Sequence, residues 1–380
     1  MKIVHVIPAL TKGGAERVVV DLGNRAVEDG HEATILTGVQ TPDELLPAPI
    51  SSKVARRTIA PRATSPRSAY PHLLPWIVRN RQWLFEQDVV HCHLSMGSVF
   101  GGLLQLVRGK RSRPAVIETY HAVGMEIPDG DRAVHAMLMK PRDAVAFVAD
   151  DPFWRDYREK HSNGRFLVIP NGIDPAPAGS RSAAERYREE LGLPATALVV
   201  GSIGRLVHER RPDLLLEAFA ELSKVHASDV HLLLGGEGPE RARLAERARY
   251  LGLAERVHLP GIVLDPPTVL GLIDLYLTVN VGPMTGIAAM EAAFSGIPVI
   301  AAQLLPAHAA AASDWIWSSP DPSALGRKAG ELLADGEARA LLSRDQQAYV
   351  RARHSVEAMA EAYYRLYEEA LVRRETDRGS

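Results

Sequence analysis

The amino-acid sequence predicts an α/β protein built from two doubly wound domains, each with a central parallel sheet. Three observations support this prediction. The chain has 380 residues, about twice the length of an ordinary single domain. Along it, short apolar runs rich in β-branched residues alternate with amphipathic helical segments, the order typical of a parallel sheet covered by helices. The turn-rich segment 170–177 interrupts this alternation and indicates a domain boundary.

The composition excludes several classes of protein. Hydrophobic residues make up 46% of the chain and charged residues 24%, which is typical of soluble globular proteins and excludes disordered and fibrous classes. The net charge of −2 gives no general attraction to nucleic acid, so we expect no nucleic-acid partner. The single Cys92 excludes an internal disulfide and favours a cytoplasmic location. No apolar run approaches the roughly 18 residues of a membrane span.

The first domain is expected over residues 1–172. Its first strand is the apolar run from Ile3 to Ile7, which is typical of a strand covered on both faces. A helix follows the glycine pair at 13–14, because apolar side chains recur at helical spacing until Gly30 ends the pattern. Similar runs predict further strands at 33–37, 89–93, 115–119, 144–149 and 166–169.

The second domain, expected over residues 173–355, repeats this architecture. It opens with an apolar strand at 198–202, followed by a helix at about 213–224 whose leucines lie on one side. Further strands are predicted at 231–234, 257–259, 275–277 and 299–301. The remaining segment, 356–380, contains a long amphipathic helix from Val356 to Val372. This helix lies too far from the last strand to be a simple crossover, so we expect it to pack back across both domains.

Three junctions between a strand and a helix are candidate phosphate sites. At such a junction, free backbone amides and the helix dipole attract an anion, and glycines allow its close approach. Gly13 and Gly14 follow the first strand, and Gly236 lies in the cluster 235–239 after a strand of the second domain. The glycine pair lacks the lysine of a P-loop and the third glycine of a dinucleotide fingerprint. Both sites can equally be tight turns.

The third junction, at Thr285, Gly286 and Ile287, adds a carboxylate. If its helix begins near Gly286, Glu291 lies in the second turn, close to the free amides. This combination suits a nucleotide, because amides bind the phosphate while a carboxylate accepts two hydrogen bonds from a ribose diol. An exposed helical glutamate is the alternative.

Arginines gather beyond the strand at 198–202. Arg205 follows that strand closely, and Arg210 and Arg211 open the next helix. Ligands of open α/β sheets bind beyond the carboxyl ends of the strands, so Arg205 is well placed to neutralise a diphosphate. The run 208–211 can also be a solvated face, which is the preferred interpretation for Arg211.

Three histidines of the first domain are candidate site residues. His91 and His93 alternate along one strand and therefore share a face, which suggests a metal site. The sequence indicates no third ligand, so structural or pocket-lining roles are preferred and no metal site is predicted. His121 ends the next strand and opens a loop, where its side chain would face a cleft; a surface histidine is the alternative.

Residues 53–81 form a basic stretch without any acidic side chain. It contains one lysine and six arginines, together with Trp76, and Trp83 follows directly. The preferred interpretation is a solvated loop followed by a helix that packs on the sheet. The alternative is peripheral contact with an anionic membrane at the inner face of the cell membrane.

Together, these residues resemble family 4 of the retaining glycosyltransferases, which have the two-domain GT-B fold. The resemblance covers most of the chain, and it rests on the joint order of motifs that are individually weak. In order, these are GGAER at 13–17, DVVHCH at 88–93, TYH at 119–121, VIPNGID at 168–174, GRLV at 204–207, GGEGP at 235–239, LGL at 251–253, RV at 256–257, GIV at 261–263, and EA at 291–292 leading to GIPVIA at 296–301.

The resemblance implies two Rossmann-like domains that face a cleft, with the nucleotide sugar on the second and the acceptor held mainly by the first. Arg205 and Arg210 would meet the diphosphate, although the family usually has a lysine in place of Arg210. His121 would orient the sugar near the reacting carbon. The donor-binding positions carried over are Gly13, Gly14, Gly236, Val263, Thr285, Gly286, Ile287 and Glu291.

The implied reaction is metal-independent transfer of a sugar from UDP or GDP to a hydroxyl of a glycan, a lipid-linked glycan or a small molecule, without a further cofactor. The family pairs two glutamates separated by seven residues, and the first of these positions is Pro283 here. This departure favours one alternative, a non-catalytic partner that binds a nucleotide sugar. A second alternative, independent of Pro283, is a GT-B nucleotide-sugar epimerase.

Overall fold

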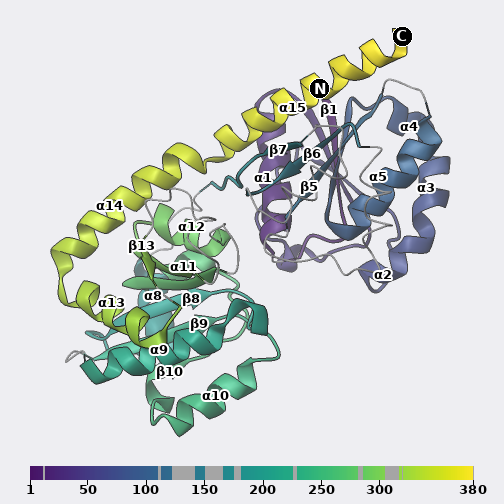
Figure 1. Ribbon diagram of the computed structural model, residues 1–380. Helices are drawn as coiled ribbons and strands as arrows, with labels where there is room; N and C mark the ends of the chain where they lie inside the picture. Colours follow the sequence, from purple (N-terminus) through teal and green to yellow (C-terminus); the bar gives the residue numbers. More distant parts are fainter. Residues whose placement is uncertain are drawn as a thin grey trace. The chain divides into compact units, whose positions relative to one another are not determined.

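The chain folds into two compact units, each built around one parallel sheet (Figure 1). Unit 1 comprises Met1–Ile173 and Ser355–Ser380, and unit 2 comprises Asp174–His354. The computed structural model describes residues 1–11, 13–109, 113–121, 142–149, 166–174, 181–225, 229–280, 286–303, 316–318 and 320–379. The two parallel α/β sheets confirm the predicted fold class. The chain passes between the units within the turn-rich segment 170–177, and the C-terminal segment is part of unit 1.

The sheet of unit 1 has seven parallel strands in the order β3-β2-β1-β4-β5-β6-β7. The strand order reverses at the neighbouring pair β1 and β4, where His5 lies opposite His91 in the register. The strands are β1 (Lys2–Ile7), β2 (Glu32–Thr37), β3 (Ala55–Thr58), β4 (Val89–His93), β5 (Ala115–Tyr120), β6 (Ala144–Phe147) and β7 (Phe166–Val168).

Helices cover this sheet because their apolar faces bury the continuous apolar runs of the strands. The side chain of Phe100 is fully buried in the resulting core. The helices of unit 1 are α1 (Gly14–Glu28), α2 (Pro66–Ala69), α3 (Leu73–Arg79), α4 (Arg81–Phe85), α5 (Leu94–Arg108) and α15 (Val356–Gly379), with the short 3-10 helices η1 (Asp43–Leu45) and η2 (Tyr70–His72).

The last helix, α15, completes the unit that the first strand begins. In Figure 1 it lies against α1 and the sheet of unit 1. Its buried side chains Tyr363 and Tyr367 reach strands of this sheet: Tyr367 Oη lies 2.7 Å from Nδ1 of His91, and Tyr363 Oη lies 2.9 Å from Oγ1 of Thr119. The helix therefore contributes polar anchors as well as apolar area to the core of unit 1.

Gly172 allows the outgoing chain to approach the start of α15 closely. A Cβ atom at this position would collide with the carbonyl oxygen of Ser355, and the Gly172 amide faces the sulfur of Met359 at 3.1 Å. The segment leaving unit 1 and the segment returning to it are therefore side by side, and only glycine fits between them.

The sheet of unit 2 has six parallel strands in the order β10-β9-β8-β11-β12-β13. Its strand order reverses between β8 and β11. The strands are β8 (Leu198–Ile203), β9 (Val230–Gly235), β10 (Val257–His258), β11 (Leu275–Asn280), β12 (Val299–Gln303) and β13 (Ile316–Ser318). The helices are α8 (Arg181–Glu190), η3 (His208–Arg210), α9 (Pro212–Val225), α10 (Arg241–Tyr250), η4 (Ala254–Arg256), α11 (Pro266–Leu270), α12 (Ile287–Phe294), α13 (Pro322–Ala334) and α14 (Gly336–Arg353).

The predicted strands are all present, within one or two residues at most ends, and the structure adds two edge strands. The sequence of β3 includes two arginines and is largely exposed, so it lacks the apolar run by which the other strands were identified. Strand β13 has only three residues. In the described part of the chain, no helix combines the length and the apolar character needed to cross a membrane.

Candidate functional site

The loops that follow β8 and β9, at the carboxyl ends of these two strands, are joined by backbone hydrogen bonds. The Gly204 amide donates to the carbonyl of Gly235 at 2.9 Å, and the Leu206 amide donates to the carbonyl of Glu237 at 2.9 Å. Gly236 has a φ of +142°, and a Cβ atom there would collide with the carbonyl oxygen of Gly204. The glycine cluster is therefore needed for a close backbone approach, as the tight-turn interpretation requires.

Val263, in the loop after β10, packs against the end of β9. Its side chain is buried, and its Cγ2 atom lies 2.6 Å from the position that a Cβ would occupy at Gly235. The contact holds the loop after β10 against the end of β9. Val263 therefore has a packing role in the described structure, next to the loop that carries Gly236.

Two arginines lie beyond the end of β8. Arg205 is exposed, and Arg210 ends η3 with its Nη1 atom 3.7 Å from the Cβ position of Gly286. The pKa of Arg210 is lowered, first because the protein partly shields its guanidinium from water and then because of the positive charge of Arg205. The side chain as a whole is still exposed to solvent. The two cations are thus close enough to repel each other, and an anion between them would relieve that repulsion.

Helix α12 begins directly beside these arginines. Gly286 is its N-cap, and no described side chain bonds the first amides of the helix, which is the arrangement of an anion-binding helix start. Glu291 is half-buried in the second turn of the helix, the position predicted from the sequence. Ile287, the first helical residue, is also half-buried, whereas Thr285 and Pro283 lie outside the described residues.

Tyr276, on β11, links these groups and was not singled out from the sequence. Its buried hydroxyl accepts a hydrogen bond from the Ile203 amide at 2.9 Å and donates to the Ile203 carbonyl at 3.1 Å. Burial raises the pKa of Tyr276 to about 12; the negative charge of Glu291 also raises it, while Arg210 lowers it. Both charged side chains are thus near Tyr276, which ties the end of β8 to β11.

Unit 2 therefore brings Arg205, Arg210, Gly286 and Glu291 to the point where its strand order reverses. In open α/β sheets this is the place where ligands bind, beyond the carboxyl ends of the strands. Two guanidinium groups and free helix amides can neutralise a diphosphate, and a carboxylate one turn further along can accept hydrogen bonds from a ribose diol. This arrangement offers the groups that a nucleotide needs for binding.

Gly13 and Gly14 lie in unit 1, at the start of α1. Gly13 is the N-cap of this helix, and its amide donates to the carbonyl of Thr11 at 2.8 Å. The carboxylate of Glu16 lies where a Cβ of Gly13 would stand. An anion approaching this helix end would thus meet a carboxylate, which makes it a weaker anion site than the start of α12.

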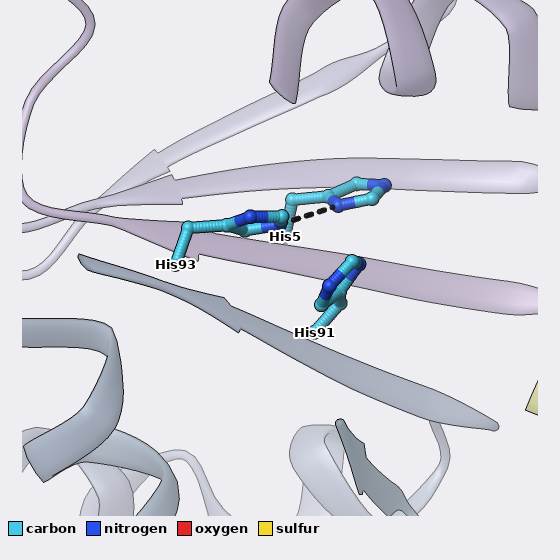
Figure 2. A group of neighbouring side chains, drawn as sticks. All are labelled: His5, His91 and His93. Atoms are coloured by element: carbon cyan, nitrogen blue, oxygen red, sulfur yellow. Dashed lines mark hydrogen bonds between the residues drawn. The ribbon is translucent and has the colours of Figure 1, made fainter. Parts of the chain in front are cut away.

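Three histidines of unit 1 form a cluster at the point where its strand order reverses. Figure 2 shows His5 on β1 and His91 and His93 on β4, with their rings gathered on one face of the sheet. The ligating nitrogens of these three residues lie within 4.8 Å of one another. His5 is the third histidine of this group, and the sequence pattern did not indicate it. It occupies the same inward-facing position in β1 that His91 occupies in β4, and this register is visible only once the strands are paired.

His121 extends this cluster from the end of β5. Its Nε2 atom lies 3.0 Å from Nδ1 of His93, and Nε2 of His93 lies 3.2 Å from Nδ1 of His5. Burial lowers the pKa of His5 and of His121 to about 4. It also lowers the pKa values of His91 and His93 well below the ordinary range. All four rings are therefore neutral at pH 7.

Comparisons with known proteins agree with this architecture. Residues 12–177 match the family model described as Glycosyltransferase Family 4, and residues 183–351 match the model described as Glycosyl transferases group 1. The D-inositol 3-phosphate glycosyltransferase of Corynebacterium jeikeium is 32% identical over 306 residues, which cover 74% of this chain and 72% of the relative. The 2-deoxystreptamine glucosyltransferase of Streptomyces kanamyceticus is 33% identical over 138 residues, 35% of each chain.

The fold is also similar to that of solved structures. The crystal structure of Anabaena Alr3699/HepE in complex with UDP and glucose superposes with a TM-score of 0.75 at 19% identity, covering 97% of this chain and 100% of that chain. At this level of identity the likeness shows the fold alone.

Proposed function

Because this chain belongs to glycosyltransferase family 4 and has the GT-B fold, we propose that it is a retaining hexosyltransferase whose acceptor is a small polyhydroxylated ring. The coarser activity follows from family membership: the protein is a glycosyltransferase that uses a nucleotide sugar as its donor. The observation that carries the proposal is the convergence of Arg205, Arg210 and the free start of α12 at the strand reversal of unit 2.

The leaving group sets the chemistry that this site has to perform. When the bond between the sugar and the diphosphate breaks, negative charge grows on the phosphate oxygens. In this proposal Arg205, Arg210 and the amides after Gly286 stabilise that charge, a role commonly worth about 3 kcal/mol for each well-placed donor. Glu291 binds the ribose hydroxyls and fixes the position of the nucleotide. These fixed cations supply the charge that a metal ion would otherwise provide, so the proposed reaction is metal-independent.

Retention of configuration requires the acceptor to attack from the face that the nucleotide leaves. The acceptor hydroxyl then forms the new bond to the anomeric carbon as the bond to the diphosphate breaks, and the departing phosphate takes the hydroxyl proton. His121, a residue of unit 1, orients the transferred sugar through a hydrogen bond.

The acceptor proposal comes from the names of the relatives. One acts on D-inositol 3-phosphate and another on 2-deoxystreptamine, and both acceptors are six-membered carbocycles that carry several hydroxyl groups. The donor nucleotide proposed first is UDP, because the similar Anabaena structure holds UDP and glucose. GDP sugars are the second choice.

A panel of donors and acceptors tests the proposal. The purified protein is incubated with UDP-glucose, UDP-N-acetylglucosamine or GDP-mannose, each with D-inositol 3-phosphate, with 2-deoxystreptamine and without acceptor. We expect one donor to release nucleoside diphosphate faster with an acceptor present, and the product to keep the donor's anomeric configuration by NMR. Tight nucleotide binding without transfer or hydrolysis across the panel would favour the non-catalytic alternative.

Peripheral membrane contact is a second proposal, and it concerns the basic stretch at residues 53–81. Trp76 packs against Phe100 at 6.1 Å between ring centroids, so this tryptophan is accounted for by the core. Leu74 and Val78, on the outer side of α3, are 45% and 43% exposed. Exposed apolar side chains beside arginines are typical of a surface that meets anionic lipid.

A further inference from the structure

Three imidazole rings of unit 1 form a single hydrogen-bonded chain. It runs from His121 through His93 to His5, with nitrogen to nitrogen distances of 3.0 Å and 3.2 Å. Both ring nitrogens of His93 are used in this chain. His91 lies beside it but is anchored elsewhere, with Nδ1 2.7 Å from Tyr367 Oη and Nε2 2.7 Å from Thr119 Oγ1.

The outer end of the chain has an unused polar atom. Among the described residues, Nδ1 of His121 is buried and has no hydrogen-bond partner. A buried polar atom without a partner costs about 1 to 3 kcal/mol, so a protein rarely keeps one that no ligand uses. The chain also lies at the strand reversal of its sheet, where ligands of such sheets bind.

Neutral imidazoles in a chain can be protonated in only two ways. Each ring has one N–H donor and one acceptor nitrogen, so each hydrogen bond between rings fixes which nitrogen of the next ring carries the proton. If His5 donates to His93, then His93 donates to His121, and Nδ1 of His121 is a donor. If every bond is reversed, Nδ1 of His121 is an acceptor.

We propose that His93 and His5 are positioning residues for His121: they hold its ring in place and determine whether its Nδ1 atom donates or accepts a hydrogen bond at the ligand. The inference rests on the proposed function in one respect, that the group facing Nδ1 is a sugar hydroxyl. A hydroxyl can both donate and accept, so either arrangement can bind it. The protein fixes one arrangement through residues that do not touch the sugar.

The geometry favours this chain over a metal centre. A bound ion needs three nitrogen lone pairs directed at one point. Both nitrogens of His93 and both of His91 already face hydrogen-bond partners, so their lone pairs and protons are committed to those partners.

Two matched substitutions of His93 separate its two hydrogen bonds. The amide of asparagine reaches about as far as Nδ1 of histidine, and the amide of glutamine about as far as Nε2. His93→Asn thus keeps a partner for His121 and loses the bond to His5. His93→Gln keeps the partner of His5 and leaves Nε2 of His121 without one. Both place one amide in the same buried position, so each serves as the control for the other.

The first readout is the tautomer of His121, measured from the nitrogen chemical shifts of protein labelled with ¹⁵N-histidine. This measurement needs no turnover, so it tests the chain even if the proposed transferase activity fails. We expect one tautomer in the wild type and a mixture in His93→Gln. If His93→Gln does not fold, His5→Leu provides the same test, because it removes the bond that fixes His93. An unchanged His121 tautomer in either variant would overturn the proposal.

The second readout is steady-state kinetics with the best donor from the panel. We expect His93→Gln to lower kcat about tenfold and His93→Asn to lower it by less than threefold, with similar melting temperatures for the two variants. Equal losses in both would overturn the positioning role. Stoichiometric binding of Zn²⁺ or Co²⁺ by the wild type that is lost in His5→Leu would instead assign the cluster to a metal.

Discussion

The guanidinium of Arg210 lies against Gly286, with Nη1 3.7 Å from the position that a Cβ would take at that glycine. A fixed cation and the positive end of the α12 dipole therefore share one small region. These two positive charges repel each other unless an anion is bound between them. The contact is what we expect of a site that binds a diphosphate strongly and stabilises the charge that grows on it.

Arg205→Ala and Arg210→Ala should each lower turnover by roughly two orders of magnitude, because each removes one stabilising donor from the leaving group. Arg210→Lys should keep most of the activity, since it preserves the charge and loses only the fork geometry. Steady-state kinetics on the best donor measures this, with circular dichroism to check folding. Near wild-type turnover in Arg205→Ala would remove this residue from the mechanism.

Glu291→Gln should weaken the binding of the nucleoside diphosphate, because a neutral amide is a poorer acceptor for the two ribose hydroxyls than a carboxylate. Isothermal titration calorimetry with UDP measures the change. Glu331→Gln, an exposed glutamate on α13, is the matched control and should leave the affinity unchanged. Equal affinities for wild type and Glu291→Gln would rule out the ribose contact.

Membrane contact through the basic stretch at residues 53–81 should depend on charge. We expect the protein to sediment with anionic vesicles and to bind less as salt rises, because exposed charges are screened over about 10 Å at 0.1 M salt. Replacing the exposed side chains of α3, Leu74→Ser with Val78→Ser, should weaken the binding further. Equal binding to neutral and anionic vesicles, or none to either, would indicate a solvated surface.

The buried histidines should make the protein less stable below neutral pH. With the folded pKa of His5 at about 4 and the unfolded value at 6.5, only the unfolded chain takes up this proton between these pH values. The free energy of unfolding should thus fall as pH falls from about 6.5 toward 4, by up to about 3 kcal/mol for His5 alone.

Measuring the free energy of unfolding in urea at pH 7 and pH 5 tests this dependence. Most carboxylates stay ionised at both pH values, so they contribute little to the difference. A His5→Gln variant cannot take up the proton, so its stability should change less between the two pH values. The same slope in both proteins would show that His5 does not contribute.

Pro283 stands where the family has the first of its two glutamates, outside the residues that the structure describes. We predict that the enzyme is active nonetheless, since in the proposed mechanism Arg205, Arg210 and Gly286 stabilise the leaving group and do not bind the sugar. Another hydroxyl hydrogen bond, typically worth about 0.5 to 1.5 kcal/mol, can be supplied by a backbone amide or by water. The donor panel should therefore reveal turnover with an unusual sugar preference. If the wild-type protein shows no transfer and the Pro283→Glu variant does, the prediction is wrong.

Local patterns were sufficient to predict much of this structure. The apolar run of β4, the turn-rich passage near Gly172 and the position of Glu291 in the second turn of α12 all depend on neighbouring residues, so periodicity and turn composition indicate them. Strand β3 was not predicted, because its exposed arginines leave it without the apolar run that indicates a buried strand.

Contacts between distant residues could not be predicted in this way. His5 joins His93 only through the pairing of β1 with β4, and Tyr276 reaches Ile203 only because β11 lies beside β8. In each case the polar side chain lies within an apolar strand, where the sequence alone shows a core residue. Once the strand order is known, polar side chains on the two strands where that order reverses indicate such contacts.

The return of α15 to unit 1 sets an order of events during synthesis of the protein. Domains generally begin to fold as they emerge from the ribosome, N-terminal part first. Here the sheet of unit 1 emerges early, but Tyr363 and Tyr367, the partners of Thr119 and His91, emerge after all of unit 2. The buried polar groups of the first sheet thus gain these partners only after all of unit 2 has been synthesised. Translation that stops before Ser355 leaves unit 2 complete in sequence and unit 1 unfinished, a nascent chain that chaperones and proteases can recognise.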